Sequence, residues 1–269
     1  MNGYDQITLN RGGAQLVGYV QPGTGPIVVL QHGLCGDASQ PAGLFPGEQG
    51  FRHAVLDCRG HGQSGAGPED QLSIAAFTDD VAAMITALDA PVAAVGGVSM
   101  GAAIALRLAV LHPQLVPALI LVRPAWAVES APANMLPNAV VGGMIAVGHG
   151  RADFDQSALA SSLDAQAPDN LASLRAFFDR TPLNITAALL RRISADGPGL
   201  SEPDLATINV PVLILGTTHD VIHPVAHAQR LETLIPGSRL VLVPPKSHDR
   251  VAHLAAVQSG IAEFMKGLS

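Results

Sequence analysis

The residue of this chain that is best placed for chemistry is a serine, Ser99, with a glycine two positions before it and another two positions after it. The stretch Gly97–Gly101 reads G-V-S-M-G and lies between an apolar run, 92–96, and an alanine-rich run that begins at Met100. A tight turn from strand to helix lifts such a serine above a sheet and strains its backbone. The helix N-terminus behind the turn favours a developing negative charge. The pattern alone also fits a glycine-rich turn with a capping serine, so residues elsewhere must decide.

Two later loops offer the partners that a nucleophilic serine needs. Asp220 follows the apolar run 211–216, and His248 follows the run 238–243. Histidine accepts and returns protons near neutral pH, and an aspartate can fix its tautomer and stabilise the imidazolium. The order serine, aspartate, histidine is that of one triad-bearing scaffold. We therefore predict Ser99 as nucleophile, His248 as general base and Asp220 as the acid.

A site for the oxyanion is also readable near the start of the chain. The apolar run 26–31 is typical of a buried parallel strand, and His32 and Gly33 follow it. Gly33 lets the backbone turn close to the serine. We expect the N–H groups of Leu34 and Met100 to face the oxygen of a tetrahedral intermediate. For His32 we favour an interior role in which it braces this loop.

The remaining pattern alternates apolar strands with helices, which is typical of a mostly parallel, doubly wound α/β sheet. Ligands of such sheets bind beyond the carboxyl ends of the strands, where the loops described above cluster. The expected strands are 7–9 and 16–20, which form an antiparallel start, followed by 26–31, 52–57, 92–97, 116–122, 211–216 and 238–243. The expected helices are 39–49, 73–89, 100–111, 224–235 and 250–266.

One long segment breaks this alternation. Between 122 and 211 no run reads as a buried strand, and several stretches show helical periodicity instead. We predict that residues 126–200 form a helical cap that covers the site and selects substrate by shape, while 1–125 and 201–269 form the core domain. The alternative is that these helices only complete the outer layer.

The expected substrate pocket is mostly apolar. Trp126 lies where the chain leaves the sheet, as a substrate platform or as packing. Arg123 ends a buried strand and needs a partner; we favour a loop carboxylate, and a substrate carboxylate is the alternative. The predicted pocket residues are Cys35, Trp126, Val221, Ile222 and Arg123, together with Leu34, Met100 and the cap residues Met135, Met144, Phe177 and Phe178.

Four motifs in this order resemble the α/β-hydrolase superfamily over nearly the whole chain. They are His32-Gly33, the block Asp57–Ser64 (D-C-R-G-H-G-Q-S), the serine turn, and the late aspartate and histidine loops. The resemblance implies an eight-stranded α/β-hydrolase sheet with an inserted helical cap, and an esterase-like enzyme that uses Ser99, Asp220 and His248. It gives the Asp57–Ser64 block a structural role. The histidine loop departs from the family pattern, because Lys246 and Ser247 stand where a glycine is common.

We therefore expect a carboxylesterase-like serine hydrolase. It would cleave a small to medium, mostly neutral ester, thioester or lactone through an acyl-enzyme. Three alternatives remain open: a C–C bond hydrolase of a dienol or diketone acid, an acyltransferase or perhydrolase, and a ligand receptor with a slow triad. A serine at position 99, rather than a carboxylate, argues against epoxide hydrolase or dehalogenase chemistry.

Composition narrows the partners. The 269 residues carry a net charge of −7 and are 48% hydrophobic, without a run of basic residues. We expect a small-molecule substrate, no nucleic acid and no membrane, in a monomer or homodimer. The lack of a signal sequence or an apolar run of membrane-spanning length, and the scarcity of cysteine, with Cys35 and Cys58 alone, favour the cytoplasm. No cofactor is implied. No metal site is expected from the histidines near the site, which lack regular ligand spacing: His219, His223, His227 and His253.

Overall fold

The structure, a computed structural model, describes residues 1–47 and 50–268. Its strands are β1 Asp5–Arg11, β2 Ala14–Val20, β3 Ile27–Gln31, β4 Arg52–Leu56, β5 Val92–Val98, β6 Leu119–Val122, β7 Val212–Thr217 and β8 Arg239–Val243. They form one eight-stranded sheet in the order β1-β2-β4-β3-β5-β6-β7-β8. β2 pairs antiparallel with β1 and β4, and all other neighbours are parallel. The predicted mostly parallel sheet is confirmed.

The helices of the core agree closely with the sequence pattern. The expected helix over 39–49 ends at Leu44, and residues 48 and 49 lie outside the described residues. Within the described ranges, no helix combines the length and the apolar character needed to cross a bilayer. The helices are α1 Ser39–Leu44, α2 Ile74–Ala87, α3 Met100–Leu111, α4 Leu136–Ala146, α5 Arg151–Asp155, α6 Ala158–Gln166, α7 Pro168–Ala176, α8 Leu183–Ser194, α9 Glu202–Leu205, α10 Val225–Leu234 and α11 Arg250–Lys266.

Helices cover both faces of the sheet because its central strands are apolar on both sides. Along β3, Ile27 and Val29 belong to the apolar layer that includes α2, α3 and α10. The alternate residues Val28 and Leu30 belong to the opposite layer, with α11. Every residue of β3 is buried. This two-sided burial explains why the strand reads as a continuous apolar run.

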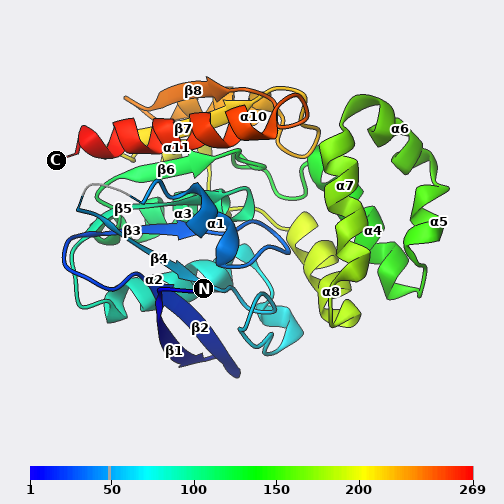
Figure 1. The fold of residues 1–269 in the computed structure, drawn as a ribbon, viewed down its shortest axis with the longest axis horizontal. Coiled ribbons are helices and arrows are strands. Elements are labelled where there is room, and N and C mark those ends of the chain that lie inside the picture. Colours follow the sequence, from blue (N-terminus) through cyan, green and yellow to red (C-terminus); the bar gives the residue numbers. More distant parts are fainter. Residues whose placement is uncertain (48–49, 269) are drawn as a thin grey trace.

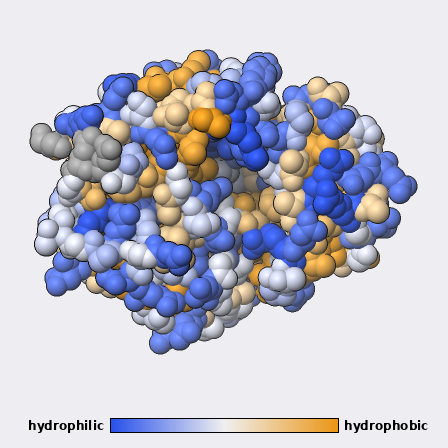
Figure 2. Space-filling view, viewed as in Figure 1, coloured by the Kyte–Doolittle hydropathy of each residue, from blue (hydrophilic) through white to orange (hydrophobic). Residues whose placement is uncertain are grey.

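The segment between β6 and β7 is helical, as predicted; apart from the short α9 just before β7, its α-helices are α4 to α8. Figure 1 shows these helices gathered beyond the carboxyl ends of the parallel strands, where the loops with the candidate site residues also lie. The molecular surface is hollowed where they meet the sheet-bearing body (Figure 2). We refer to α4–α8 as the inserted helices. Their division from the core at residues 126 and 200 remains a prediction.

The turn from β5 into α3 is packed too tightly for side chains at its glycines. A Cβ atom on Gly101 would lie 2.3 Å from the carbonyl oxygen of Gln31, and one on Gly96 would lie 2.3 Å from that of Ile120. A Cβ atom on Gly97 would lie 2.5 Å from the backbone of Gly101 itself. These contacts are to backbone atoms, which cannot move without disturbing the sheet. The glycines therefore let α3 approach β3 and hold the turn between them.

Gly101→Ala is expected to destabilise the fold by about 1–3 kcal/mol, because the added methyl group overpacks a backbone contact. Gly143→Ala, in the middle of α4, provides the matched control, since nothing lies within 4 Å of its Cβ position. It should raise stability by roughly 0.5–1 kcal/mol through the helix preference for alanine. Urea unfolding of both variants measures the difference. Equal midpoints would contradict the packing described here.

Candidate active site

Ser99 occupies the strained turn that its flanking glycines predicted. Its backbone has φ 55° and ψ −110°, a region that residues with a side chain rarely adopt. The turn is fixed from the neighbouring strand, because the Ser99 N–H donates to the carbonyl of Val122 at 3.0 Å. The side chain is largely buried at 8% exposure, yet it lines a cavity. The sheet thus holds the strained turn in place, and the turn presents the Ser99 hydroxyl to the cavity.

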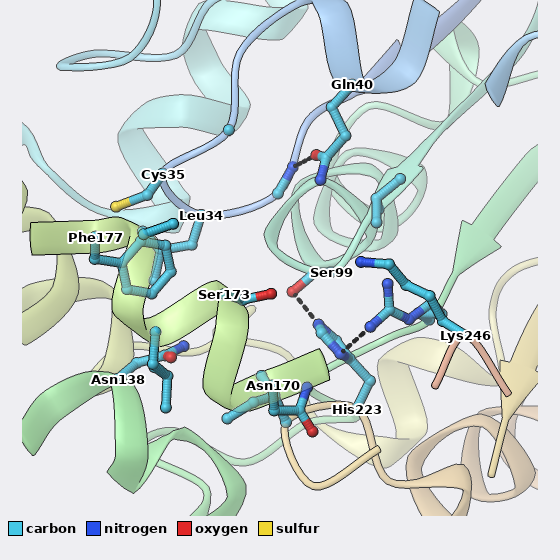
Figure 3. Close-up of a pocket in the computed structure, with 17 residues that line it drawn as sticks. Leu34, Cys35, Gln40, Ser99, Asn138, Asn170, Ser173, Phe177, His223 and Lys246 are labelled. Carbon is cyan, nitrogen blue, oxygen red and sulfur yellow. Dashed lines mark hydrogen bonds between the residues drawn. The ribbon is translucent and has the colours of Figure 1, made fainter. Parts of the chain in front are cut away.

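His223 is the histidine that meets this hydroxyl. Its Nε2 lies 2.8 Å from Ser99 Oγ (Figure 3). Its Nδ1 lies 3.0 Å from both carboxylate oxygens of Asp220. Asp220 and His223 lie in the loop after β7, three residues apart, and the His223 backbone N–H also donates to the same carboxylate at 3.0 Å. One short loop therefore holds both a carboxylate and an imidazole in line with Ser99.

The structure does not bring His248, the predicted base, to Ser99. His248 follows β8 in a turn in which its N–H donates to the carbonyl of Pro245 at 3.0 Å. Its side chain is exposed and packs against His219, with ring centroids 4.8 Å apart. The turn directs the side chain outward, and His223 takes the place beside Ser99. The sequence pattern missed this because a histidine three residues after Asp220 reads as part of the loop.

The carboxylate of Asp220 gathers donors from three parts of the chain. Arg123, at the end of β6, forms a salt bridge to Oδ2, as the sequence predicted for a loop carboxylate. Asn170, from α7 of the inserted helices, donates to Oδ1 at 2.9 Å and accepts the N–H of Val221 at 2.9 Å. Sequence analysis did not identify Asn170, since nothing in the sequence relates α7 to this loop. The inserted helices thus help to hold the acid.

These neighbours set the charge of both groups. Burial alone would raise the pKa of Asp220, but His223 and Arg123 outweigh it and hold the pKa far below its usual range. Burial lowers the pKa of His223 and the nearby Arg123 guanidinium lowers it further, against the opposing effect of Asp220. At neutral pH the site therefore holds an ionised aspartate and a neutral histidine, which is the state that a general base requires.

Two buried histidines tie the loop after β3 to the loop after β4. His32 accepts the N–H of Cys58 at Nε2, and His61 accepts the N–H of Cys35 at Nε2, each at 3.0 Å. Their Nδ1 atoms lie 2.9 Å from backbone carbonyls, so both rings are neutral with the proton on Nδ1. The rings lie 4.7 Å apart. This reciprocal pair, the histidine clasp, confirms the interior role expected for His32.

The Asp57–Ser64 block also has the bracing role that was expected. Asp57 accepts the N–H groups of Ala38 at 2.8 Å and Gln63 at 2.9 Å. Arg59 forms a buried salt bridge to Asp80 of α2, 2.6 Å from Nε to the carboxylate. None of these groups lines the cavity around Ser99. The block holds loops in place and carries no functional group to the site.

Two backbone N–H groups near Ser99 have no acceptor among the residues that the structure describes. The Gly33 N–H donates to Gln40 Oε1 at 2.6 Å and the Cys35 N–H is taken by His61, but no acceptor within the described residues binds the N–H of Leu34 between them. Met100 is the first residue of α3, so its N–H has no acceptor inside the helix. These are the two donors that the sequence predicted.

The cavity beside Ser99 has a volume of about 270 Å³ and a more polar lining than expected. It includes three of the five predicted pocket residues, Cys35, Arg123 and Ile222. The predicted Leu34 and Phe177 also line it, whereas Met100, Met135, Met144 and Phe178 do not. The lining side chains that sequence analysis did not identify are mostly polar, namely Gln40, Asn138, Asn170, Ser173, His223 and Lys246, along with Val98, Leu174 and Ala176.

Two predicted pocket residues have other positions. Trp126 is buried in the core at 1% exposure, and its indole N–H donates to the carbonyl of Asp196 at 3.0 Å. It is packing, and the platform interpretation is wrong. Val221 does not line the cavity either; its side chain is 37% exposed and its N–H binds Asn170. Both residues flank the site in sequence, but their side chains turn away from it.

The cysteines and the remaining histidines add no second reactive centre. Cys35 and Cys58 are both free and buried, and burial raises the pKa of the Cys35 thiol to about 12. A thiol with such a pKa is not a nucleophile at neutral pH. Within residues 1–47 and 50–268, no group of three or more His, Cys, Asp or Glu side chains is arranged to hold a metal ion.

Comparison with known proteins shows the family to which this fold belongs. The model of the protein family described as the alpha/beta hydrolase fold matches residues 26–250, which is most of the chain. The chain belongs to the α/β-hydrolase fold family. The family assignment confirms the resemblance drawn from the four motifs, and the similar proteins include esterases, lactonases and thioesterases, which supports a hydrolase.

Individual relatives within the α/β-hydrolase family are distant. The enol-lactonase from Burkholderia xenovorans has a similar structure, with a TM-score of 0.71 and 26% identity over 97% of this chain and 100% of that chain. A putative carbamate hydrolase, RutD, from Serratia proteamaculans is 29% identical over 80% of this chain and 81% of its own length. An uncharacterised protein from Mycobacterium bovis is 28% identical over 84% of this chain and 71% of its own length.

The buried histidines predict an acid-sensitive fold. Burial lowers the pKa of His32, of His61 and, to about 4, of His53. An unfolded histidine binds a proton near pH 6.5, so between about pH 6.5 and 4 the unfolded chain binds more protons. The free energy of unfolding is therefore highest above about pH 6.5. It falls as the pH is lowered, by up to roughly 1.4 kcal/mol per pH unit for each histidine. Urea unfolding at several pH values measures this slope.

Single substitutions identify the source of the slope. His53→Gln should reduce it, whereas His149→Gln, at an exposed position, should not. Asp220 does not interfere, because its lowered pKa matters only below the ordinary aspartate range of about 3.9. Burial raises the pKa of Asp57, which opposes the slope, whereas the lowered pKa values of His223, His227 and His253 add to it. A free energy of unfolding that stays constant from pH 6.5 to 4.5 would show that protonation of these histidines does not destabilise the folded state.

Proposed function

We propose that this protein is a serine hydrolase that cleaves an ester, thioester or lactone through an acyl-enzyme on Ser99. In the proposed triad, Asp220 is the acid and His223 is the base. The carrying observation is the 2.8 Å contact between Ser99 Oγ and His223 Nε2, at a serine with a strained backbone that lines the cavity. The family assignment and the hydrolase neighbours support the reaction class.

The proposal requires one tautomer of His223. Its Nδ1 must carry a proton and donate to Asp220, so that Nε2 can accept the proton of Ser99. Arg123 Nη2 lies 3.1 Å from the same Nδ1, where it would compete as a donor. Arg123 is already paired with the carboxylate, and two carboxylate oxygens lie 3.0 Å from Nδ1. The ionised acceptor therefore favours the proton on Nδ1.

The reaction then follows from the groups in place. Ser99 Oγ attacks the carbonyl carbon while its proton passes to His223 Nε2, and the developing oxyanion binds the N–H groups of Leu34 and Met100. The bond to the leaving group breaks as that group takes the proton from His223. Water then attacks the acyl-enzyme, again giving a proton to His223, and Ser99 regains its proton as the acid departs. The balance of the cycle is the addition of one water molecule.

Ser99→Ala should lower kcat on an activated aryl ester by about 10³-fold or more, because the covalent route is lost. A fluorophosphonate probe should label the wild type and not the variant, as read by mass spectrometry of the intact protein. Ser64 provides the internal control, since it is buried and donates to the carbonyl of Asp57. Labelling at Ser64, or unchanged turnover in Ser99→Ala, would refute the nucleophile. Tight binding of esters without turnover would indicate a receptor.

The base is tested by a matched pair of histidine variants. His223→Gln should abolish most activity, whereas His248→Gln should retain it, because His248 is exposed and away from Ser99. Since burial and Arg123 lower the pKa of His223, kcat/KM should stay high through neutral pH and fall only below about pH 6.5, where the histidine becomes protonated. The pH profile of the wild type and of both variants gives the measurement.

The reverse result would move the base to the other loop. If His248→Gln removes the activity and the acid limb while His223→Gln keeps both, the loop after β8 must rearrange to place His248 beside Ser99. The chain order serine, aspartate, histidine is the same in both cases. The serine hydrolase proposal therefore survives this outcome, and only the identity of the base changes.

A further inference from the structure

We propose that Lys246 binds an acid group of the substrate, so that the enzyme prefers acyl substrates that carry a carboxylate. The inference rests on the proposed serine hydrolase and specifies its substrate class. It departs from the mostly neutral substrate expected from the sequence. The observation behind it is a lysine that lines the cavity with Ser99 and His223 and forms no hydrogen bond or salt bridge with any residue that the structure describes.

Lys246 lies in the loop after β8, and Figure 3 shows its side chain extending into the cavity toward Ser99. No hydrogen bond or ion pair joins its ammonium group to any residue that the structure describes. The side chain is partly buried. A half-buried ammonium group loses part of its hydration. Asp169 and Asp220 attract the Lys246 ammonium group, but neither forms a salt bridge with it. A bound anion would replace the lost hydration.

The surrounding charges favour such an anion. Arg123 is the other cation that lines the cavity, and its charge is balanced by Asp220 in the salt bridge. Lys246 therefore adds a positive charge that the lining does not neutralise. Burial lowers the pKa of Lys246, and repulsion from Arg123 and Arg250 lowers it further, against the opposing attraction of Asp169 and Asp220. A carboxylate beside Lys246 would relieve both effects.

A second cavity, next to the one that contains Ser99, can hold the acid end of a substrate. It has a volume of about 280 Å³ and adjoins the first, since Gln40, Val98, Arg123 and Lys246 line both. Arg250 and His253 add polar groups to it, and Leu44 and Leu254 add apolar surface. His253 is held by the carbonyl of Pro244 at 2.8 Å from its Nδ1. An acyl chain that starts at Ser99 can thus end in a carboxylate near Lys246.

Asp169 of α7 is the competing explanation for Lys246. Its Oδ2 is buried without a hydrogen-bond partner, and its charge attracts Lys246. If Lys246 served to pair with Asp169, it would join the core to the inserted helices and act on all substrates alike. If Lys246 binds a substrate carboxylate, Asp169 instead repels that carboxylate. Removing the Asp169 charge should therefore favour acid substrates if Lys246 binds the substrate carboxylate, and should affect acid and neutral substrates equally if Lys246 pairs with Asp169.

The test compares esters that differ only at the far end of the acyl chain. The pairs are the mono-4-nitrophenyl esters of succinic, glutaric and adipic acid against 4-nitrophenyl butyrate, pentanoate and hexanoate. The measured quantity is the ratio of kcat/KM for the acid ester to that for the neutral ester. In Lys246→Met this ratio should fall about tenfold to a hundredfold in the best pair, mainly through KM, since a charged hydrogen bond is lost. In Asp169→Asn it should rise.

Lys266→Met is the matched control, because Lys266 is exposed in the last turn of α11 and should leave the ratio unchanged. A ratio that Lys246→Met leaves unchanged in all three pairs, with the esters still hydrolysed, would overturn the acid subsite alone. So would equal losses on both esters in Lys246→Met and Asp169→Asn. Failure of the hydrolase itself looks different: no ester is turned over and no probe labels Ser99.

A binding measurement does not depend on turnover. Titration calorimetry with succinate, glutarate and adipate should show equal binding to the wild type and to Lys266→Met. The affinity of Lys246→Met should be at least tenfold weaker. Binding should also weaken with added salt, because it is electrostatic. Equal affinities in the wild type and Lys246→Met would contradict the proposal whatever the activity of the enzyme.

Discussion

The carboxylate of Asp220 is the point on which the arrangement of the site depends. It is largely buried, and an isolated buried carboxylate would be too costly to remain ionised. Arg123 from β6, Asn170 from α7 and the His223 ring and backbone share that cost, so three separate parts of the chain converge on one group. The position of the imidazole follows from this convergence. The inserted helices are therefore part of the support of the acid as well as a boundary of the cavity.

The turn at Ser99 is a second constraint, and it is independent of the first. The glycines around it allow α3 to contact the backbone of β3, and Val122 fixes the serine from the neighbouring strand. Neither contact involves Asp220 or the inserted helices. Ser99 is thus positioned by the sheet, while Asp220 and His223 are positioned by a loop and the inserted helices. The Ser99 turn and the loop that carries Asp220 and His223 are therefore held independently, and the hydrogen bond between Ser99 and His223 links them.

Local patterns in the sequence predicted most of the fold and some of the contacts around Ser99. The apolar runs located the strands because burial on both faces leaves a continuous signal, and the glycines located the Ser99 turn because backbone contact excludes side chains. The pairing of Arg123 with a loop carboxylate followed from burial of a charge. The histidine beside Ser99, the Asn170 contact and the unpaired Lys246 depend on how loops and inserted helices pack across the sheet edge. No periodicity or spacing within one segment reports such contacts, so His248 was the natural expectation.

The histidine clasp also bears on how this chain can change over generations. His32 and His61 each accept a backbone N–H from the other's loop, so losing one ring leaves a buried donor without a partner while the other bond persists. A single change is then penalised, and a new loop has to arrive together with a matching counterpart. The loops after β3 and β4 should therefore be inherited and exchanged as one unit, although some twenty-six residues separate the bonded groups along the chain. Grafting either loop alone into a relative would transfer one histidine and one backbone N–H without the partners that they need.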